Sequence, residues 1–214
     1  MNCFKGAIFD MDGTLTDSMY IWDTTGMTYL RQQGKTPEPG LREKLRPLSL
    51  VQAAELFQKE YGITQKVDEI LQAFNTIVEE EYRKNVTLKP GAEDLLKRLQ
   101  EDGIVMSVAS SSPRDIVAMV LERLGVGRYF SHIVTCGDVG LGKDHPHVYD
   151  RAAELMGTDR NSTVVFEDAL HAVKTAAAAG YYVVGVYDES EGVHEDQIEA
   201  LSSRYVKTLE GFSL

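Results

Sequence analysis

The 214-residue sequence contains few residues of the kinds that mark secreted, redox-active or membrane-spanning proteins. Its two cysteines, Cys3 and Cys136, lie far apart and form neither a disulfide framework nor a C-x-x-C motif, which indicates a reducing compartment. No apolar run approaches the length of a membrane span, and no secretory leader precedes the first predicted strand. We therefore expect a cytoplasmic protein with no membrane partner.

Positive charge is also scarce. The 22 lysines and arginines against 33 acidic residues give a formal net charge of −11. Such a balance disfavours nucleic acid and anionic membrane surfaces as partners. The length and the 43% hydrophobic content suit one large soluble domain, or a core with an insertion. We expect a monomer or a weak dimer.

Short apolar runs alternate with amphipathic segments over residues 90–214. Together with an apolar run at residues 7–9, they predict a series of strands separated by helices. The later strands are predicted at residues 104–109, 132–135, 163–166 and 182–186, with a short edge strand at 205–206. This alternation is typical of a parallel sheet with helices on both faces. The sequence thus predicts an α/β fold with a Rossmann-like core made of residues 1–15 and 90–214.

Residues 16–89 have a different pattern. The spacing of apolar residues predicts helices from Asp17 or Ser18 to about Gly34, over 50–61 and over 67–82, and no convincing strand. Because this segment interrupts the core after its first strand, we interpret it as an all-helical cap domain. We expect such an insertion to lie over the C-terminal edge of the sheet.

Two aspartates directly follow the first predicted strand. Ala7-Ile8-Phe9 is short and apolar, and Asp10 and Asp12 leave its C-terminal end. Side chains two residues apart on an extended strand share a face, and ligands of open α/β sheets bind at this end. The two carboxylates are therefore a candidate nucleophile and acid/base pair, if a cation reduces their repulsion. Alternatively, Asp12-Gly13 forms a simple turn and Asp10 caps the strand.

Polar residues also follow the next two predicted strands. Ser110 and Ser111 precede a predicted helix, where hydroxyls and free backbone N–H groups bind phosphate; an ordinary helix cap is the alternative. Lys143 lies in a glycine-rich loop that nearly matches the P-loop pattern, but Asp144 replaces the required hydroxyl residue. Lys143 can still neutralise a phosphoryl group, although a surface lysine is the commoner role in such a loop.

Glu167 and Asp168 follow the fourth strand of the series. Two adjacent acids at the end of an apolar strand are costly unless they are paired or bind metal, although acids also complement a helix dipole. With Asp10 and Asp12 they predict a cluster of four carboxylates balanced by Lys143. Oxygen ligands suit a hard divalent cation, and we expect Mg²⁺.

The order of these groups along the chain resembles a known family. The series Asp10-x-Asp12-Gly13-Thr14, Ser110, Lys143 and Glu167-Asp168 is similar to the four motifs of the haloacid dehalogenase superfamily, and it extends over the whole chain. The helical insertion resembles that of the subgroup with β-phosphoglucomutase and phosphoglycolate phosphatase. This resemblance implies a Mg²⁺-dependent phosphatase that hydrolyses a small phosphorylated metabolite through an aspartyl-phosphate.

The resemblance also implies a role for each motif residue. Asp10 is the nucleophile, and Asp12 protonates the leaving alcohol and then activates water. Ser110 and Lys143 hold the phosphoryl group. The groups implied to bind Mg²⁺ are Asp10, the backbone carbonyl of Asp12, Asp168 and, directly or through water, Glu167.

Two positions in the insertion bear on the choice between phosphatase and mutase. The histidine of the first cap helix in β-phosphoglucomutases is Trp22 here, and the arginine that grips a second phosphate there falls on Leu50. Both departures favour a phosphatase. A phosphosugar mutase remains the nearer alternative, and a non-catalytic phosphate-binding or phospho-switch protein the more distant one. Tyr20 and Trp22 are candidates to line the substrate pocket, or else they pack inside the cap.

Overall fold

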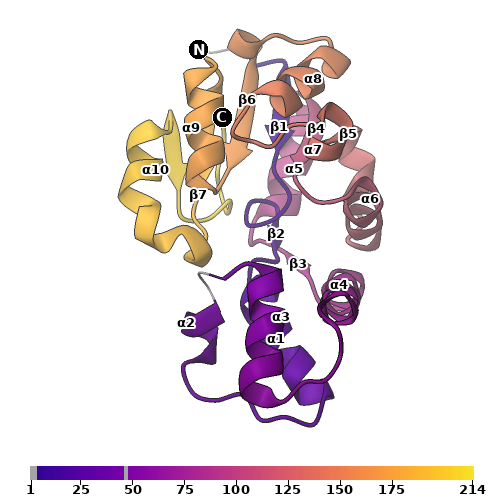
Figure 1. Ribbon diagram of the computed structural model, residues 1–214. Helices are drawn as coiled ribbons and strands as arrows, with labels where there is room; N and C mark the ends of the chain where they lie inside the picture. Colours follow the sequence, from indigo (N-terminus) through magenta and orange to yellow (C-terminus); the bar gives the residue numbers. More distant parts are fainter. Residues whose placement is uncertain (1–3, 46–47) are drawn as a thin grey trace. The chain divides into compact units, whose positions relative to one another are not determined.

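The structure is a computed structural model that describes residues 4–45 and 48–214. The chain divides into two compact units (Figure 1). The α/β unit comprises Met1–Ser18 and Val86–Leu214, and the helical unit comprises Met19–Asn85. The helical unit thus starts three residues later and ends four residues earlier than the insertion expected from the sequence.

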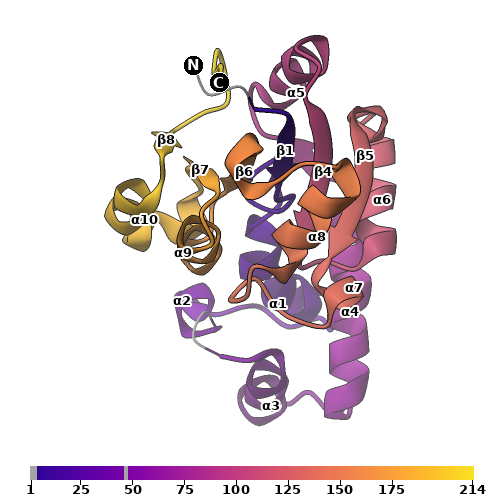
Figure 2. The ribbon, with the colours of Figure 1, turned by 90° about the horizontal axis from the view of Figure 1, so that it is seen from above.

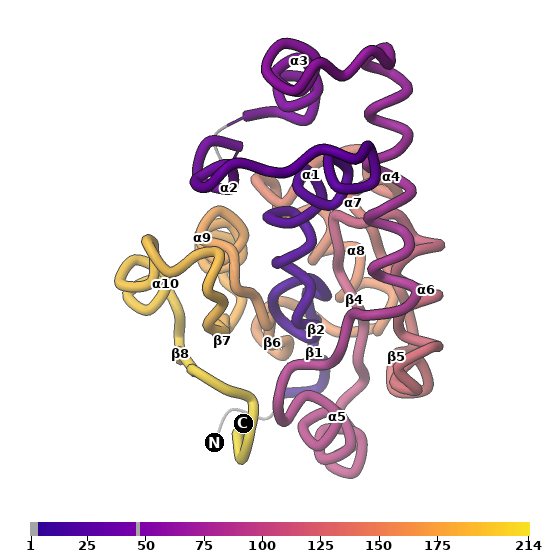
Figure 3. The backbone as a smooth tube through the Cα atoms, turned by 90° about the horizontal axis from the view of Figure 1, so that it is seen from below, coloured from indigo at the N-terminus to yellow at the C-terminus, as the bar shows by residue number. Residues whose placement is uncertain are grey.

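A six-stranded parallel sheet forms the centre of the α/β unit. Its strands lie in the order β5 (Phe130–Thr135), β4 (Val105–Ser110), β1 (Gly6–Phe9), β6 (Thr163–Glu167), β7 (Tyr182–Val186) and β8 (Arg204–Val206). Figure 3 shows β1 in the middle of this row. The apolar run of β1 is fully buried because the strand is covered on both faces. The predicted fold class, a Rossmann-like α/β core, is confirmed.

Helices cover both faces of the sheet (Figure 2). Ile8 and Val165 lie in a core cluster with residues of α8 (His147–Met156), α9 (Leu170–Ala178) and α10 (Glu195–Leu201). Because neighbouring strand residues point to opposite faces, Phe9 and Phe166 lie on the other side, where their rings stack with centroids 4.3 Å apart. The remaining helices of this unit are α5 (Ala92–Glu101), α6 (Arg114–Arg123) and the short α7 (Cys136–Val139), with short 3₁₀ helices at Gly127–Tyr129, Arg160–Ser162 and Glu189–His194.

The helical unit has an aromatic core of its own. Its helices are α1 (Tyr20–Gln32), α2 (Leu41–Leu45), α3 (Leu50–Tyr61) and α4 (Val67–Lys84). The Tyr29 ring stacks on Phe57 and meets Phe74 edge to face, with centroids 5.9 and 5.3 Å away. Gly26 allows this close approach of the helices, because a Cβ there would lie 2.8 Å from a methyl group of Leu45.

Three local features differ from the sequence-based expectation. The two-residue strands β2 (Thr16–Asp17) and β3 (Thr87–Leu88) pair antiparallel, although no strand was predicted between residues 16 and 89. They are too short to show any periodicity. The short α2 was missed for the same reason. The predicted cap of the first helix is also wrong: α1 begins after Met19, which makes no side-chain cap bond.

Among the described residues, no helix is both long and apolar enough to cross a membrane.

Candidate active site

The register of the sheet brings two acidic strand ends together. Phe9 of β1 pairs with Phe166 of β6, so the next residues, Asp10 and Glu167, lie side by side where the two strands end. The backbone N–H of Asp10 still donates to the Phe166 carbonyl at 3.0 Å, which fixes where the chain leaves β1. Asp10 is 6% exposed and Glu167 is 1% exposed. The two carboxyl groups therefore lie next to each other in a buried site.

Lys143 lies between these two carboxylates. Its loop follows α7, and its side chain is 4% exposed. The ammonium donates to Oδ1 of Asp10 and, at 2.5 Å, to Oε1 of Glu167. The hydroxyl of Tyr149, in the first turn of α8, donates to the same Glu167 oxygen at 2.7 Å. Glu167 is thus held through one oxygen by two donors.

Asp168 completes the acidic cluster and depends on the turn after Asp10. Thr14 Oγ1 donates to Oδ1 of Asp168 at 2.8 Å. Gly13 has a φ of 85°, and a Cβ there would lie 2.3 Å from Oδ2 of Asp168. Glycine is required at this position both by the backbone conformation and by the space that the carboxylate occupies.

The cluster contains more acidic than basic groups, and this imbalance shifts the pKa values of its members. Burial raises the pKa of Asp10 well above its usual value; Lys143 opposes this, while Glu167 and Asp168 raise the pKa further. Burial and the charge of Glu167 raise the pKa of Asp168 to about 8. Burial alone would lower the pKa of Lys143, but the Asp10 and Glu167 carboxylates raise it above the usual value. One ammonium group therefore does not balance three buried carboxyl groups.

The same cluster fits a metal ion. Carboxylate oxygens of Asp10, Glu167 and Asp168 lie within 4.8 Å of one another, and all three residues are buried. Hard divalent cations such as Mg²⁺ prefer oxygen ligands of this kind. The raised pKa values of Asp10 and Asp168 show that added positive charge would be favourable here.

The Asp12 carboxylate lies outside that group of oxygens and is held by two serines. Ser18 Oγ donates to its Oδ1 and Ser112 Oγ donates to its Oδ2, each at 2.7 Å. Thr16 Oγ1 contacts Ser18 Oγ at 3.0 Å, so a chain of hydroxyls leads to this carboxylate. A carboxylate with fixed orientation and only partial burial can exchange a proton with a bound molecule.

The other predicted phosphate-binding residues differ in their surroundings. Ser110, at the end of β4, is fully buried, and its hydroxyl accepts a hydrogen bond from the Ser112 backbone N–H at 3.0 Å. Ser111 is exposed, and its hydroxyl lies 3.5 Å from the sulfur of Cys136. The third serine of the run, Ser112, is the one that contacts Asp12.

The two cap candidates, Tyr20 and Trp22, lie on α1 in the helical unit. The hydroxyl of Tyr20 donates to Glu81 of α4 at 3.1 Å, so it is tied to the neighbouring helix. Trp22 is 51% exposed and lines a pocket within this unit.

Four contact residues were missed by sequence reasoning as members of the site: Thr14, Ser18, Ser112 and Tyr149. Thr14 ends the motif that begins at Asp10, and Ser112 directly follows Ser110 and Ser111. These positions in the sequence were a usable signal. Ser18 was assigned to a helix cap, and Tyr149 was not singled out. Their contacts depend on the tertiary fold, so the sequence pattern held no signal for them.

Comparison with known proteins identifies the family to which the chain belongs. A model described as haloacid dehalogenase-like hydrolase matches residues 7–186. Hexitol phosphatase A of Escherichia coli is 30% identical over 188 residues, which cover 87% of this chain and 84% of that protein. The bifunctional riboflavin kinase/FMN phosphatase of Arabidopsis thaliana is 29% identical over 84% of this chain, which spans only 47% of that protein. The resemblance drawn from the motifs is confirmed.

A solved structure supports the fold. The crystal structure of a putative β-phosphoglucomutase from Thermotoga maritima superposes with a TM-score of 0.85 and covers 97% of this chain and 96% of its own. The sequence identity is 22%, so this likeness bears on the fold alone.

Proposed function

Because the chain belongs to the haloacid dehalogenase-like hydrolase family, we propose that it is a Mg²⁺-dependent phosphatase that hydrolyses a small phosphorylated metabolite. The two relatives described above are both named phosphatases, one of a hexitol phosphate and one of FMN. These names agree on the enzyme class, a phosphoric monoester hydrolase, and differ in the substrate.

The proposed reaction has two steps, each using both leading aspartates. In the first, a carboxylate oxygen of Asp10 bonds to phosphorus while the ester P–O bond breaks. Asp12, in its acid form, gives its proton to the departing alkoxide, which leaves as an alcohol. In the second, the Asp12 carboxylate takes a proton from water, whose oxygen bonds to phosphorus and breaks the aspartyl-phosphate bond. One water is consumed and Asp10 is regenerated.

We assign the other residues of the site to binding the phosphoryl group and to orienting Asp12. Lys143 donates to Asp10 in the free protein and is in position to bind an oxygen of the transferring phosphoryl group. Ser110 and Ser111, at the end of β4, supply further donors to this group. Ser18 and Ser112 orient Asp12 for proton transfer.

Asp10, Glu167 and Asp168, with the Asp12 backbone carbonyl, are the groups we assign to Mg²⁺. When bound, the ion neutralises charge that develops on the phosphoryl oxygens. The residues that surround it are fixed independently: Thr14 holds Asp168, while Tyr149 and Lys143 hold Glu167.

One observation carries the proposal: Lys143 bridges Asp10 and Glu167 in a buried cluster that also contains Asp168. Such a cluster is unfavourable for stability by itself, because each buried charge loses its hydration. It is suited to a reaction in which a charged phosphoryl group and a divalent cation enter together.

The test is the Asp10→Asn variant with p-nitrophenyl phosphate and Mg²⁺. Loss of the nucleophile should lower kcat by about 10³-fold or more. The control is Asp17→Asn, which changes an exposed aspartate of the same segment and should leave kcat unchanged. Retention of turnover by Asp10→Asn would remove the nucleophile assignment.

A second measurement separates hydrolysis from the mutase alternative. With β-glucose 1-phosphate as substrate, a phosphatase releases inorganic phosphate, whereas a mutase accumulates glucose 6-phosphate. A phosphorylated protein that never turns over would instead indicate a phospho-switch.

A further inference from the structure

A groove of about 500 Å³ runs along α9 in the α/β unit, outside the carboxylate cluster. One wall is a single face of α9, because helical residues three, four and seven positions apart lie on the same side. This face carries His171, Lys174, Thr175 and Ala178. The opposite wall comes from residues that flank α8, with Asp144 before that helix and Arg160 after it.

Two basic side chains of this groove have no partner. Among residues 4–45 and 48–214, neither the Lys174 nor the His171 side chain makes a hydrogen bond or an ion pair, and both residues are exposed. The helix that carries them has no acidic residue from Leu170 to Ala178. The net charge of the chain is −11, so an excess of basic residues does not explain an unpaired lysine here. The ammonium of Lys174 is free to bind an anion.

Arg160 is a second cation of the groove and is held in a fixed direction. Its guanidinium donates to the two carboxylate oxygens of Asp150 at 2.8 and 2.6 Å, and to the Ala179 carbonyl at 2.9 Å. These bonds use three of its five N–H donors. The side chain is 45% exposed, so the other two donors are available to a ligand. A cation that is already held in place loses little conformational freedom on binding.

One acid determines where an anion fits. Among the described lining residues, the acid is Asp144, whose side chain is 71% exposed. Asp144 directly follows Lys143, whose ammonium binds Glu167 at the end of β6. Arg160 instead contacts the carbonyl of Ala179, directly beyond the C-terminal end of α9. The favourable place for an anion is therefore between Lys174 and Arg160, away from Asp144.

The rest of the lining suits the apolar part of an organic molecule. Pro146, Ala178 and Ala179 present carbon atoms to the groove and leave it open because they are small. Small-molecule sites typically occupy about 300–1,000 Å³ and combine an apolar lining with a few polar groups. At about 500 Å³ the groove has room for a small organic molecule as well as its charged group.

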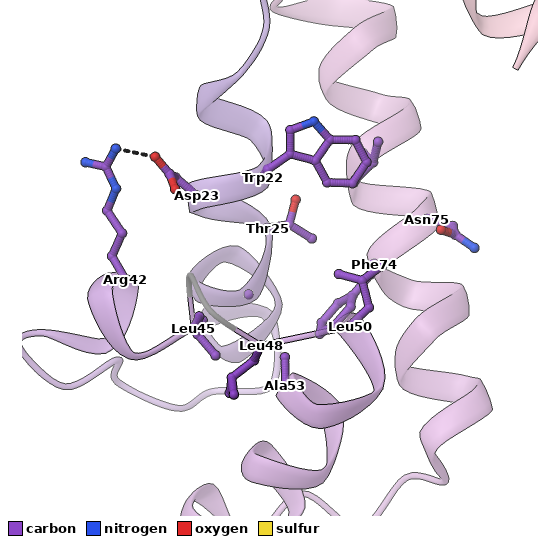
Figure 4. Close-up of a pocket in the computed structure, with 12 residues that line it drawn as sticks. Trp22, Asp23, Thr25, Arg42, Leu45, Leu48, Leu50, Ala53, Phe74 and Asn75 are labelled. Atoms are coloured by element: carbon purple, nitrogen blue, oxygen red, sulfur yellow. Dashed lines mark hydrogen bonds and ion pairs between the residues drawn. The ribbon is translucent and has the colours of Figure 1, made fainter. Parts of the chain in front are cut away.

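A pocket of about 210 Å³ in the helical unit provides a contrast (Figure 4). Its lining is mainly apolar, with Trp22 and Phe74 among the larger side chains. The basic residue of its described lining, Arg42, forms an ion pair with Asp23, which lines the same pocket (dashed line in Figure 4). An anion there would have to compete with Asp23. Lys174 has no such partner, so the charge argument applies to the groove along α9.

We infer that this groove binds a small organic anion. Its carboxylate or phosphate group is held by Lys174 and Arg160, and its apolar part lies on Pro146 and Ala178. The site is separate from the carboxylate cluster, and the inference does not depend on the proposed phosphatase function.

The test is isothermal titration of the full chain with 2-naphthoate in Mg²⁺-free buffer. The uncharged 2-naphthalenemethanol has the same ring system and is the matched ligand. The naphthoate should bind saturably at one site and at least about tenfold more tightly than the alcohol, because its charge is what the two cations recognise. Equal affinities, or no saturable binding of the naphthoate, would overturn the inference.

Two variants with the same change of charge form a matched pair. Lys174 and Lys97 are both exposed and lie near the middle of α9 and α5, but Lys97 does not line the groove. Lys174→Glu should weaken binding of the naphthoate at least about tenfold, and Lys97→Glu should leave it unchanged. If the two variants bind equally, net charge and not the groove governs the affinity.

Amide chemical shifts locate the bound anion without any variant. On addition of 2-naphthoate, the ¹H–¹⁵N signals of residues 174–179 should move, and those of Ser110, Ser111 and Ser112 should not. The opposite pattern would place the anion in the candidate active site and overturn the inference. Neither measurement requires turnover, so a failed phosphatase proposal would not affect the result.

Discussion

The two units each contain an ion pair, and the two pairs differ in how deeply they are buried. In the α/β unit, Lys143 and Glu167 form an ion pair with side chains 4% and 1% exposed. In the helical unit, Arg42 and Asp23 form an ion pair with side chains 46% and 16% exposed, beside an apolar pocket. The pair in the first unit is thus buried, whereas the pair in the second is partly in contact with water.

This difference in burial determines how strongly the two charges of each pair interact. Buried charges interact strongly because water does not screen them, and their loss leaves a partner that is neither hydrated nor paired. An exposed pair is screened by water, and its loss costs little. Loss of one partner should therefore be more costly at the buried pair of the α/β unit than at the partly exposed pair of the helical unit.

The largest contrast is expected when the cation of each pair is replaced by methionine. Among the described residues, Lys143 is the cation that pairs with both Asp10 and Glu167, so Lys143→Met should lower kcat by at least about 10²-fold. Without Mg²⁺ it should also reduce the free energy of unfolding by about 3–5 kcal/mol, because buried carboxylates lose their partner. Steady-state kinetics and urea unfolding measure the two effects.

Arg42→Met is the matched change in the helical unit. The Arg42 side chain is 46% exposed, so the free energy of unfolding should fall by no more than about 1 kcal/mol. Similar losses of stability in the two variants would show that the two units do not differ in how strongly their charges interact.

The next effect concerns pH and metal in the α/β unit. The pKa of Asp168 is about 8 in the folded protein, because of burial and the charge of Glu167, whereas an unfolded aspartate ionises near a pKa of about 3.9. Between these values the folded chain holds a proton that the unfolded chain has lost. The contribution of Asp168 to the stability of the metal-free protein should therefore be fully present below about pH 3.9 and be lost as the pH rises through about 8, by up to about 1.4 kcal/mol per pH unit.

Two comparisons check this assignment. Asp168→Asn removes the titrating group and should flatten the decrease between pH 5 and 8 in urea unfolding experiments. Saturating Mg²⁺ should also flatten it in the wild type, since the ion binds the ionised carboxylates that the proton otherwise neutralises. A slope that is the same in the wild type and in Asp168→Asn would assign the pH dependence to other groups.

Sequence reasoning identified the strand ends at which the candidate site residues lie, and the roles of these residues stay predictions. Asp10, Lys143 and Glu167 could be selected because parallel strands all end at one edge of the sheet, whatever their order. The run of apolar residues before Asp10 and before Glu167 marked these ends without any structure. The fold class followed from the same alternation of strands and helices.

Contacts between distant side chains could not be obtained in that way. Tyr149 lies in a helix and is buried like other tyrosines of the core. Its hydrogen bond to Glu167 therefore cannot be predicted without knowing how α8 packs on the sheet. Ser18 fits a helix cap by type, yet it directly follows the short strand β2, lies outside α1 and donates to Asp12. Two-residue strands carry no periodicity by which to predict this.

The smallest effect in the comparison is expected from removing one hydroxyl in each unit. Tyr149→Phe takes a donor from Glu167 and leaves Lys143 to orient that carboxylate alone, so Mg²⁺ affinity should fall about tenfold. Tyr20→Phe removes a bond to Glu81 in the helical unit and should leave Mg²⁺ affinity unchanged. Isothermal titration of the metal measures both without turnover. Because phenylalanine preserves the ring packing of each tyrosine, an equal affinity in the two variants would show that Lys143 alone suffices to hold Glu167 in place.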